Sequence, residues 1–266
     1  MTTPLDHATP GPLTGRIALV TGVSRRIGIG FAIAQRLARQ GADVFVHSWS
    51  PFDATQPWGA DEGGIEDILA ELRETGRRIE HFAADFRDPY APEQVVRAAF
   101  DAFGHVDILV ANHAYSTMGA LEDLTAEQID THMQVNVRGT LLLIKEWVTR
   151  HDDSRRGGRV ILMTSGQYRG AMPEELSYVA SKGALQQLTL SLSAHLAPRH
   201  ITVNTVDPGA TDTGYADDAL RERIVDFEPM GRWGEPDDAA RLIAWLCGDE
   251  ARWITGQVIA STGGGP

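Results

Sequence analysis

A tyrosine and a lysine four residues apart, Tyr178 and Lys182, have side chains that can move a proton together. Lysine occurs only twice among the 24 basic residues, so a lysine at this position calls for a reason. On a helix the two side chains share one face. A free tyrosine has a pKa of about 10, and a nearby cation lowers that pKa. The pair is therefore either a proton-transfer couple or an exposed i,i+4 pair on a solvated helix.

A glycine-rich turn supplies a second chemical feature. Gly22, Gly28 and Gly30 lie between a short apolar run and a segment with helical periodicity. In such a turn, backbone amides and the helix N-terminus can hold a pyrophosphate, and glycine leaves room for its approach. The turn predicts a dinucleotide site if it follows the first strand of a βαβ unit.

The elements that would position these residues alternate regularly. Apolar runs typical of buried strands cover residues 16–21, 44–48, 79–83, 106–111, 160–164, 201–206 and 257–260. Helical periodicity covers residues 31–39, 65–75, 92–103, 126–150, 176–197 and 237–247. This pattern predicts an α/β fold of the Rossmann type, a doubly wound, seven-stranded parallel sheet with helices on both faces. We expect an N-terminal extension, residues 1–15, and one dinucleotide-binding catalytic domain, residues 16–266.

Composition excludes several functional classes. A net charge of −12 argues against nucleic acid or an anionic membrane as the main partner. No apolar run reaches the roughly 20 residues that cross a bilayer, and no secretory signal precedes the domain, so we expect a cytoplasmic protein. The histidines show no pair at ligand spacing, so we expect no metal site. Cys247, the single cysteine, lies in an apolar run typical of core.

Taken together, these motifs resemble those of the short-chain dehydrogenase/reductase family, in particular its 3-oxoacyl carrier-protein reductases. The resemblance covers residues 15–264. The motifs occur in the family's order: the Thr21–Gly22 turn, Asp85, Asn112 to Tyr115, Asn136, Ser165, Tyr178 with Lys182, and Pro208–Gly209 with Thr213.

The resemblance implies a role for each catalytic residue. Tyr178 is the general acid, Ser165 hydrogen-bonds the substrate oxygen, and Lys182 lowers the tyrosine pKa while holding the nicotinamide ribose. Asn136 holds a water that returns the proton through Lys182.

The same resemblance implies the binding residues. The cofactor residues are Gly22, Ser24, Arg25, Gly28, Ile29, Gly30, Ser48, Trp49, Asp85, Phe86, Asn112, Ala114, Tyr178, Lys182, Pro208, Gly209, Thr211 and Thr213. The substrate residues are Tyr115, Gln167 and Tyr168.

Three departures from the family pattern stand out. Five residues separate Gly22 from Gly28 where the family has three, as in the related enoyl reductases. Those enzymes carry six residues between tyrosine and lysine, whereas Tyr178 and Lys182 enclose three, which favours ketone or alcohol chemistry. Tyr115 replaces a usual glycine and either narrows the pocket or only packs. Residues 51–64 form an insertion, which we expect to be a mobile surface loop, the alternative being that Trp58 covers the adenine.

The cofactor follows from the end of the second strand. NAD-binding folds carry an acidic residue about 20 positions beyond the glycine turn, and Ser48 and Trp49 stand there instead. Arg25 and Arg26 in the lengthened turn suit a 2′-phosphate. We therefore expect NADP, with NAD possible if Asp53 takes the acidic role.

The expected function is NAD(P)-dependent hydride transfer between nicotinamide and a carbonyl or secondary alcohol. The substrate is a small molecule or an acyl-carrier conjugate, and a 3-oxoacyl-type or other ketone reductase is favoured. An alcohol or sugar dehydrogenase is the alternative within the family, and a non-catalytic nucleotide sensor is the alternative outside it. By resemblance, we expect a homotetramer built on the helices at residues 126–150 and 176–197.

Overall fold

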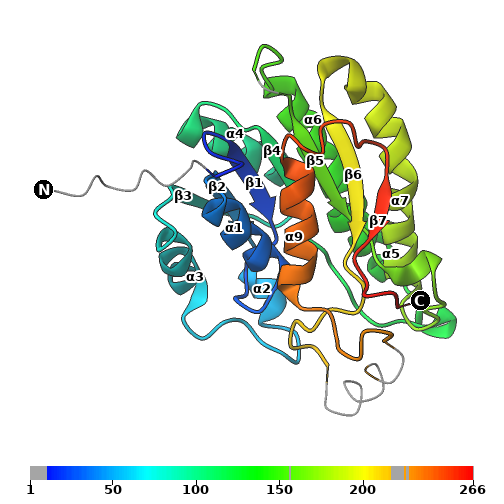
Figure 1. The fold of residues 1–266 in the computed structure, drawn as a ribbon. Coiled ribbons are helices and arrows are strands. Elements are labelled where there is room, and N and C mark those ends of the chain that lie inside the picture. The colour runs from blue at the N-terminus through cyan, green and yellow to red at the C-terminus, as the bar shows by residue number, and fades with distance from the viewer. Residues whose placement is uncertain (1–10, 156, 217–224, 226–227, 266) are drawn as a thin grey trace, which may run out of the picture.

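A seven-stranded, fully parallel sheet forms the centre of the molecule in the computed structural model, which describes residues 11–155, 157–216, 225 and 228–265. The strands are β1 (Ile17–Thr21), β2 (Asp43–Ser48), β3 (Ile79–Ala83), β4 (Ile108–Ala111), β5 (Arg159–Met163), β6 (Thr202–Asp207) and β7 (Val258–Ala260). Their order is β3-β2-β1-β4-β5-β6-β7 (Figure 1). The predicted fold class is confirmed.

Helices cover both faces of this sheet. They are α1 (Ile29–Arg39), α2 (Ser50–Asp53), α3 (Gly64–Arg73), α4 (Ala91–Phe103), α5 (Ala126–His132), α6 (Thr140–Arg150), α7 (Leu176–Leu196) and α9 (Pro236–Cys247). A π-helix, η2 (Met133–Gly139), joins α5 to α6, and short 3₁₀ turns occupy η1 (Leu121–Asp123), η3 (Gly166–Tyr168) and η4 (Ala197–Arg199). The predicted helix at residues 126–150 is therefore interrupted by a π-helical segment.

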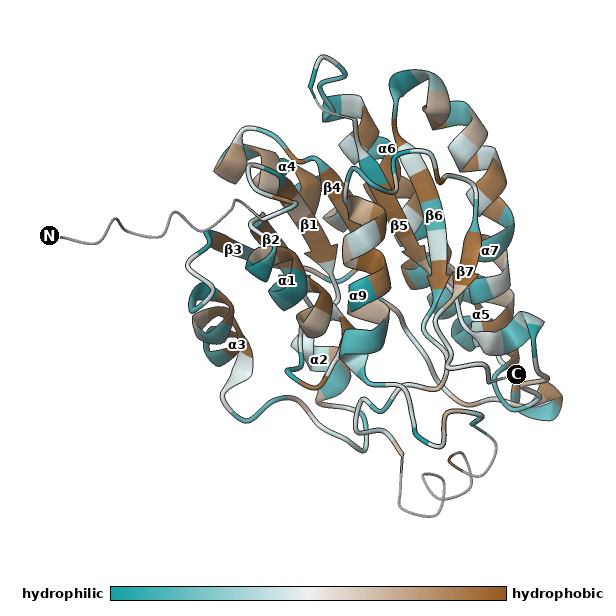
Figure 2. Cartoon of the chain, viewed as in Figure 1, coloured by the Kyte–Doolittle hydropathy of each residue, from teal (hydrophilic) through white to brown (hydrophobic). Residues whose placement is uncertain are grey.

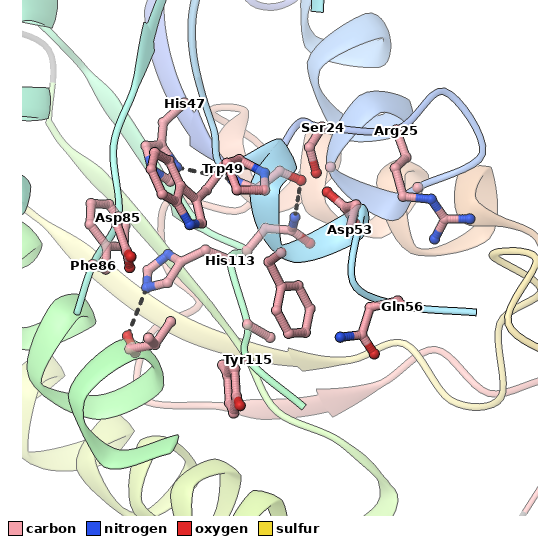
Figure 3. Close-up of a pocket in the computed structure, with 18 of the residues that line it drawn as sticks. Ser24, Arg25, His47, Trp49, Asp53, Gln56, Asp85, Phe86, His113 and Tyr115 are labelled. Carbon is pink, nitrogen blue, oxygen red and sulfur yellow. Dashed lines mark hydrogen bonds between the residues drawn. The ribbon is translucent and has the colours of Figure 1, made fainter. Parts of the chain in front are cut away.

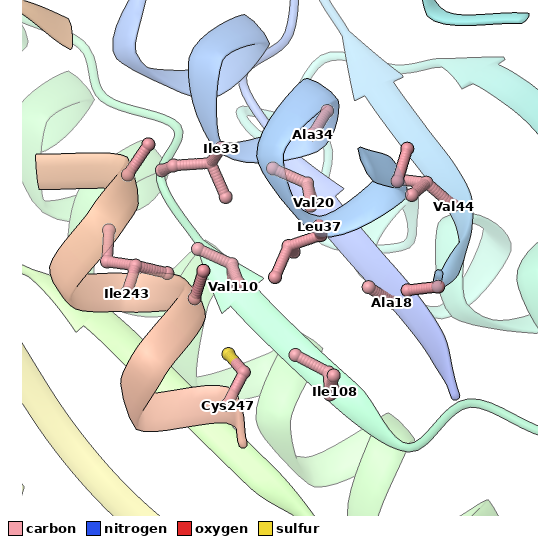
Figure 4. Close-up of a cluster of buried hydrophobic side chains, with 14 of the residues drawn as sticks. Ala18, Val20, Ile33, Ala34, Leu37, Val44, Ile108, Val110, Ile243 and Cys247 are labelled. Atoms are coloured by element: carbon pink, nitrogen blue, oxygen red, sulfur yellow. The ribbon is translucent and has the colours of Figure 1, made fainter. Parts of the chain in front are cut away.

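Alternation along the strands divides the core into two layers. Val20 of β1 packs with Ile33 of α1 and Ile243 of α9, whereas the adjacent Leu19 points to the opposite layer with Trp147 of α6. Helices α1 and α9 lie side by side on the first face (Figure 4). Apolar residues predominate along β1, β4 and β5, as Figure 2 shows. The parallel sheet is thus buried from both sides.

Cys247 lies in the first of these layers and is fully buried, as expected. Burial raises the pKa of its thiol to about 12, so it behaves as core rather than as a nucleophile.

The strand order reverses at β1, because β2 lies on one side of it and β4 on the other. Ligands of doubly wound sheets bind beyond the carboxyl ends of the strands at such a reversal. Residues 1–10 of the expected N-terminal extension lie outside the described residues. Within the described part of the chain, no helix has the length and apolarity to span a bilayer.

Candidate active site

A cavity of about 400 Å³ lies at the carboxyl ends of β1 to β4, where the strand order reverses. Figure 3 shows side chains from these loops converging on it. The predicted residues in its wall are Gly22, Ser24, Arg25, Gly28, Ile29, Gly30, Trp49, Asp85, Phe86, Asn112, Ala114, Tyr115 and Thr213. The structure therefore gathers most of the predicted cofactor residues in one place.

The glycine turn is packed so tightly that side chains are excluded. A Cβ on Gly30 would lie 2.2 Å from the carbonyl oxygen of Gly22, and Gly22 itself has a φ of +74°. Helix α1 begins directly after Gly28, which offers no side-chain cap to the helix amides. These first-turn amides border the cavity, an arrangement that fits an anionic pyrophosphate.

Asn112 fixes the turn from the neighbouring strand. Its amide Nδ2 donates to the carbonyl oxygens of Thr21 at 3.0 Å and Gly22 at 3.2 Å. Its own backbone N donates to the Thr21 hydroxyl at 3.0 Å. The loops after β1 and β4 are therefore held as one unit.

Two buried histidines, which the sequence reasoning missed, form the cavity floor. His47 stacks on Phe86 with ring centroids 4.3 Å apart, and His113 meets Phe86 edge-on at 4.4 Å. Burial lowers the pKa of His47 to about 4 and that of His113 well below its usual value. Both rings are neutral at pH 7. His113 stands where the family has asparagine, and that departure was the available signal.

The insertion is a surface loop over residues 54–63, but its first residues are not the loop that we expected. Helix α2 begins at Ser50, after its N-cap residue Trp49, and includes the first residues of the insertion. In this helix, Phe52 packs against Tyr115 with ring centroids 5.0 Å apart. Phe52 and Asp53 both line the cavity. Apolar contact across the cavity mouth explains why the segment is ordered. Trp58 is not part of that wall but lies against Arg25, which is, and the alternative in which Trp58 covers the adenine stays a prediction.

Arg25 and Asp53 bring opposite charges to the same part of the wall. Arg25 donates from Nη2 to the carbonyl of Thr213 at 2.8 Å, and its guanidinium lies 5.5 Å from the centre of the Trp58 ring. Burial lowers the pKa of Arg25. Burial likewise raises the pKa of the Asp53 carboxyl, an effect that Ser24 and Arg25 oppose.

Two neighbours of this pair turn away from the cavity. Arg26 binds Asp61 on the exposed side of the turn, with Nε 3.2 Å from Oδ2. Ser48, predicted as a cofactor residue, is absent from the cavity wall because its hydroxyl is bonded to His81 at 2.8 Å.

Lys182 is buried beneath the ring of Tyr178. Its Nζ donates to the carbonyl of Met163 at 3.0 Å and lies 5.6 Å from the centre of the Tyr178 ring. Burial lowers the pKa of this ammonium to about 8. The pair is therefore no exposed couple on a solvated helix.

The electrostatics of Tyr178 differ from the sequence expectation. Burial raises the pKa of its phenol well above the usual value, and the carboxylates of Glu175 and Asp207 act in the same direction. Interaction with the Ser165 hydroxyl opposes this change. We expected Lys182 to lower the pKa, but its ammonium is itself desolvated and bonded to Met163. Tyr178 is consequently protonated at neutral pH, as a proton donor must be.

Asn136 lies within η2 and hydrogen-bonds protein partners through both atoms of its amide. Its Nδ2 donates to the Tyr115 carbonyl and to the Ser181 hydroxyl, both at 2.9 Å, and its Oδ1 accepts from the Tyr115 backbone N at 2.7 Å. The side chain therefore ties the cavity wall to α7 at the turn that carries Lys182.

The predicted substrate residues have different environments. Gln167 faces the protein: its Oε1 accepts from the backbone N of Ser165 at 3.2 Å, and its Nε2 donates to Gln186 at 3.0 Å. It positions the Ser165 loop, and we withdraw it as a substrate contact. Tyr168 is 43% exposed beside the same loop, with Arg169 over its ring.

The loop after β6 is organised by a buried ion pair. Arg169 Nε donates to Asp207 Oδ2 at 2.9 Å, and Asp207 Oδ1 accepts from the backbone N of Gly209 at 2.9 Å. Of the predicted residues here, only Thr213 reaches the cavity wall, whereas Pro208, Gly209 and Thr211 do not, since Thr211 bonds back to the Pro208 carbonyl.

Within the described residues, no group of three or more acidic, histidine or cysteine side chains could hold a metal ion.

Comparison with known proteins adds an independent line of argument. The profile of a family described as Enoyl-(Acyl carrier protein) reductase matches residues 22–265. The uncharacterized oxidoreductase YjdA of Bacillus subtilis is 42% identical over 94% of this chain and 96% of its own. The hydroxynaphthalene reductase-like protein Arp2 of Metarhizium majus is 30% identical over 97% and 98%. The angucycline C-6 ketoreductase LanV, solved with bound NADP, superimposes with a TM-score of 0.84 at 36% identity, covering 97% of this chain and 98% of LanV.

Proposed function

The chain belongs to the short-chain dehydrogenase/reductase family, and from that premise we propose that it is an NADP(H)-dependent reductase of ketones. The observations that carry the proposal are the buried ammonium of Lys182 against the Tyr178 ring, the interaction of that tyrosine with Ser165, and a cavity at the carboxyl ends of β1 to β4 that fits a dinucleotide. A non-catalytic nucleotide sensor has no need of a desolvated lysine beneath a protonated phenol.

Reduction is the direction that these side chains favour. The bound nicotinamide supplies a hydride to the carbonyl carbon. Tyr178, protonated because its pKa is raised, donates the proton to the carbonyl oxygen, and the Ser165 hydroxyl hydrogen-bonds the same oxygen. Lys182 holds a positive charge beneath the phenol, which stabilises the phenolate that remains after transfer. Three residues separate Tyr178 from Lys182, and this spacing favours carbonyl over double-bond chemistry despite the description of the matched family.

The choice of NADP(H) rests on Arg25. A guanidinium in the cavity wall offers paired donors to a 2′-phosphate, and Ser48, at the acidic position of NAD enzymes, is turned toward His81. The ketoreductase LanV binds NADP. Asp53 in the same wall opposes this choice, but Ser24 and Arg25 partly offset its charge.

Paired substitutions test the cofactor assignment. Arg25→Ala removes a charge-assisted contact and is expected to lower the preference for NADPH over NADH by about 10- to 100-fold. Asp53→Asn removes the opposing charge and is expected to raise that preference. Michaelis constants for both cofactors check both arms, and an unchanged preference in Arg25→Ala would contradict the assignment.

For the substrate, we propose a ketone on a planar, ring-hydroxylated aromatic framework. Tyr215 affects the pKa of Tyr178 and contacts Trp233 at 5.7 Å between ring centroids, and Tyr168 lies in the turn that follows Ser165. Arp2 is named as a hydroxynaphthalene reductase-like protein and LanV as an angucycline ketoreductase.

An acyl-carrier substrate fits this surface less well. Arg155, Arg156 and Arg199 are the arginines that could meet an acidic carrier; Arg199 binds Asp153 at 2.7 Å and Arg155 lies 4.0 Å from Asp107, while Arg156 lies outside the described residues. Absorbance assays with bicyclic aromatic ketones, simple acyl thioesters, sugars and secondary alcohols test the proposal. It predicts turnover of the aromatic ketones with NADPH, and turnover confined to sugars or alcohols would overturn it.

A further inference from the structure

Residues 50–61, which we call the strap, follow β2 and run along the wall of the cofactor cavity. Part of the glycine turn lies in the same wall. Figure 3 shows Asp53 and Gln56 of the strap around this cavity, together with Arg25 and Tyr115. The strap therefore borders the space that fits a dinucleotide. Its residues in the wall are Pro51, Phe52, Asp53, Thr55 and Gln56.

The first part of the strap makes a contact beyond the carboxyl end of β1. Phe52 follows β2 and Tyr115 follows β4, and these two strands flank β1 in the sheet. The two rings nevertheless lie only 5.0 Å apart between centroids. Their contact therefore crosses the line of β1 beyond its carboxyl end, where Gly22 begins the turn that fits a pyrophosphate.

Tyr115 is the fixed side of this ring contact. Its backbone N donates to Asn136 Oδ1 at 2.7 Å, and its carbonyl accepts from Asn136 Nδ2 at 2.9 Å. Its ring also meets His132 edge-on at 4.8 Å. Phe52 instead belongs to the four-residue helix α2, and its backbone N donates to Trp49, three residues earlier, at 3.3 Å. Opening of the contact therefore moves the strap rather than Tyr115.

The far end of the strap is attached to the glycine turn. Asp61 Oδ2 accepts from the backbone N of Arg26 at 2.8 Å and from its Nε at 3.2 Å. The Arg25 guanidinium lies 5.5 Å from the centre of the Trp58 ring. With both ends attached, the cavity keeps a volume of about 400 Å³, which is typical of small-molecule sites. A ligand can therefore lie beneath the closed strap.

We propose that the strap closes over the bound nicotinamide dinucleotide and sets the rate at which this cofactor enters and leaves. The contact between Phe52 and Tyr115 holds the strap closed. This inference rests on the proposed function, which requires such a cofactor. A closed strap slows association and dissociation alike, because both pass through the open form. A side chain that only touches the bound cofactor slows dissociation alone.

Stopped-flow fluorescence of NADPH measures both rate constants without a ketone substrate. Phe52→Ala is expected to raise both by about 3- to 10-fold, the effect of one aromatic pair, and to leave Kd within about twofold. Asp61→Ala removes the other attachment without changing the rings, and we expect both rate constants to rise there too. Trp253→Ala is the matched control and should leave both unchanged. This aromatic residue is 94% exposed between α9 and β7, at the opposite end of the sheet.

Circular dichroism checks that the variants fold. Phe52→Leu keeps an apolar side chain but no ring, so it is expected to show a smaller increase and replaces Phe52→Ala if that variant does not fold. Unchanged rate constants in Asp61→Ala or in the Phe52 variant, or an increase confined to dissociation, would overturn the inference and leave the proposed function standing. If the protein prefers NADH, the same measurement with NADH tests the strap. Binding of neither dinucleotide would overturn both proposals.

Discussion

At the scale of single residues, burial acts in opposite directions on the two central side chains. It raises the pKa of Tyr178, which keeps the phenol protonated, and lowers that of Lys182 to about 8, which makes its charge easier to lose. A proton that leaves Tyr178 can be replaced from a group whose pKa lies near neutrality. The protein thus holds a desolvated ammonium beside the phenol, where the proposed reaction leaves a negative charge.

Lys182 should therefore reduce the stability of the fold at neutral pH. Its folded pKa of about 8 lies below the value of 10.5 for the free side chain. The cost is fully present below pH 8 and disappears as the pH rises through 10.5, because the unfolded chain binds the extra proton in that window.

Lys182→Met is expected to raise the free energy of unfolding by on the order of 2 kcal/mol at pH 7. This net gain already subtracts about 1 kcal/mol for the hydrogen bond to Met163 that the variant loses. Urea unfolding of the wild type and of Lys182→Met from pH 7 to 10.5 measures this difference in stability. The advantage of the variant should vanish as the pH approaches 10.5. A variant less stable than the wild type at pH 7 would contradict the argument.

At the scale of elements, the turn between β1 and α1 depends on the absence of one side chain. Gly30→Ala places a methyl group 2.2 Å from the Gly22 carbonyl and 2.7 Å from Asn112 Nδ2, so the turn must open. We expect loss of measurable NADPH binding in a fluorescence titration.

Gly183→Ala is the matched control for this substitution, since a Cβ there meets nothing within 4 Å. On α7 the same change is expected to stabilise the fold by about 0.5–1 kcal/mol and to leave cofactor binding intact. Normal NADPH affinity in Gly30→Ala would show that the tight turn does not shape the site.

The sequence predicted these elements well where a repeating pattern marks them. The strands and the glycine turn are confirmed, because buried parallel strands and βα turns have strong local signatures. The π-helix at Met133–Gly139 was missed, because one extra residue per turn barely disturbs an apolar pattern. Helix α2 was missed because contact between Phe52 and Tyr115, far apart in sequence, orders it. The raised pKa of Tyr178 depends likewise on burial that no motif records.

At the scale of the whole molecule, apolar side chains remain exposed on the helices that we expected to form subunit contacts. Leu190 of α7 is 68% exposed and Ile129 of α5 is 41% exposed. Both lie on elements whose other faces already cover the sheet or η2. We propose that these surfaces pair in a homotetramer.

Leu190→Glu tests that assembly. A charge in an apolar subunit contact is expected to convert the tetramer into smaller species at micromolar concentration, which light scattering measures directly. Tyr90→Glu, at a residue 69% exposed at the start of α4, is the control and should leave the mass unchanged. A wild-type monomer under these conditions would refute the proposed assembly.

The proposed reduction depends on a proton that Tyr178 donates, and Tyr178→Phe removes that proton. The substitution removes only the phenolic hydroxyl, so NADPH should bind with unchanged affinity. Reduction of an aromatic ketone, followed by absorbance of NADPH, should fall by about 10²- to 10⁴-fold, the usual contribution of a positioned acid. Retention of more than about a tenth of the wild-type rate, with the cofactor bound normally, would contradict the account.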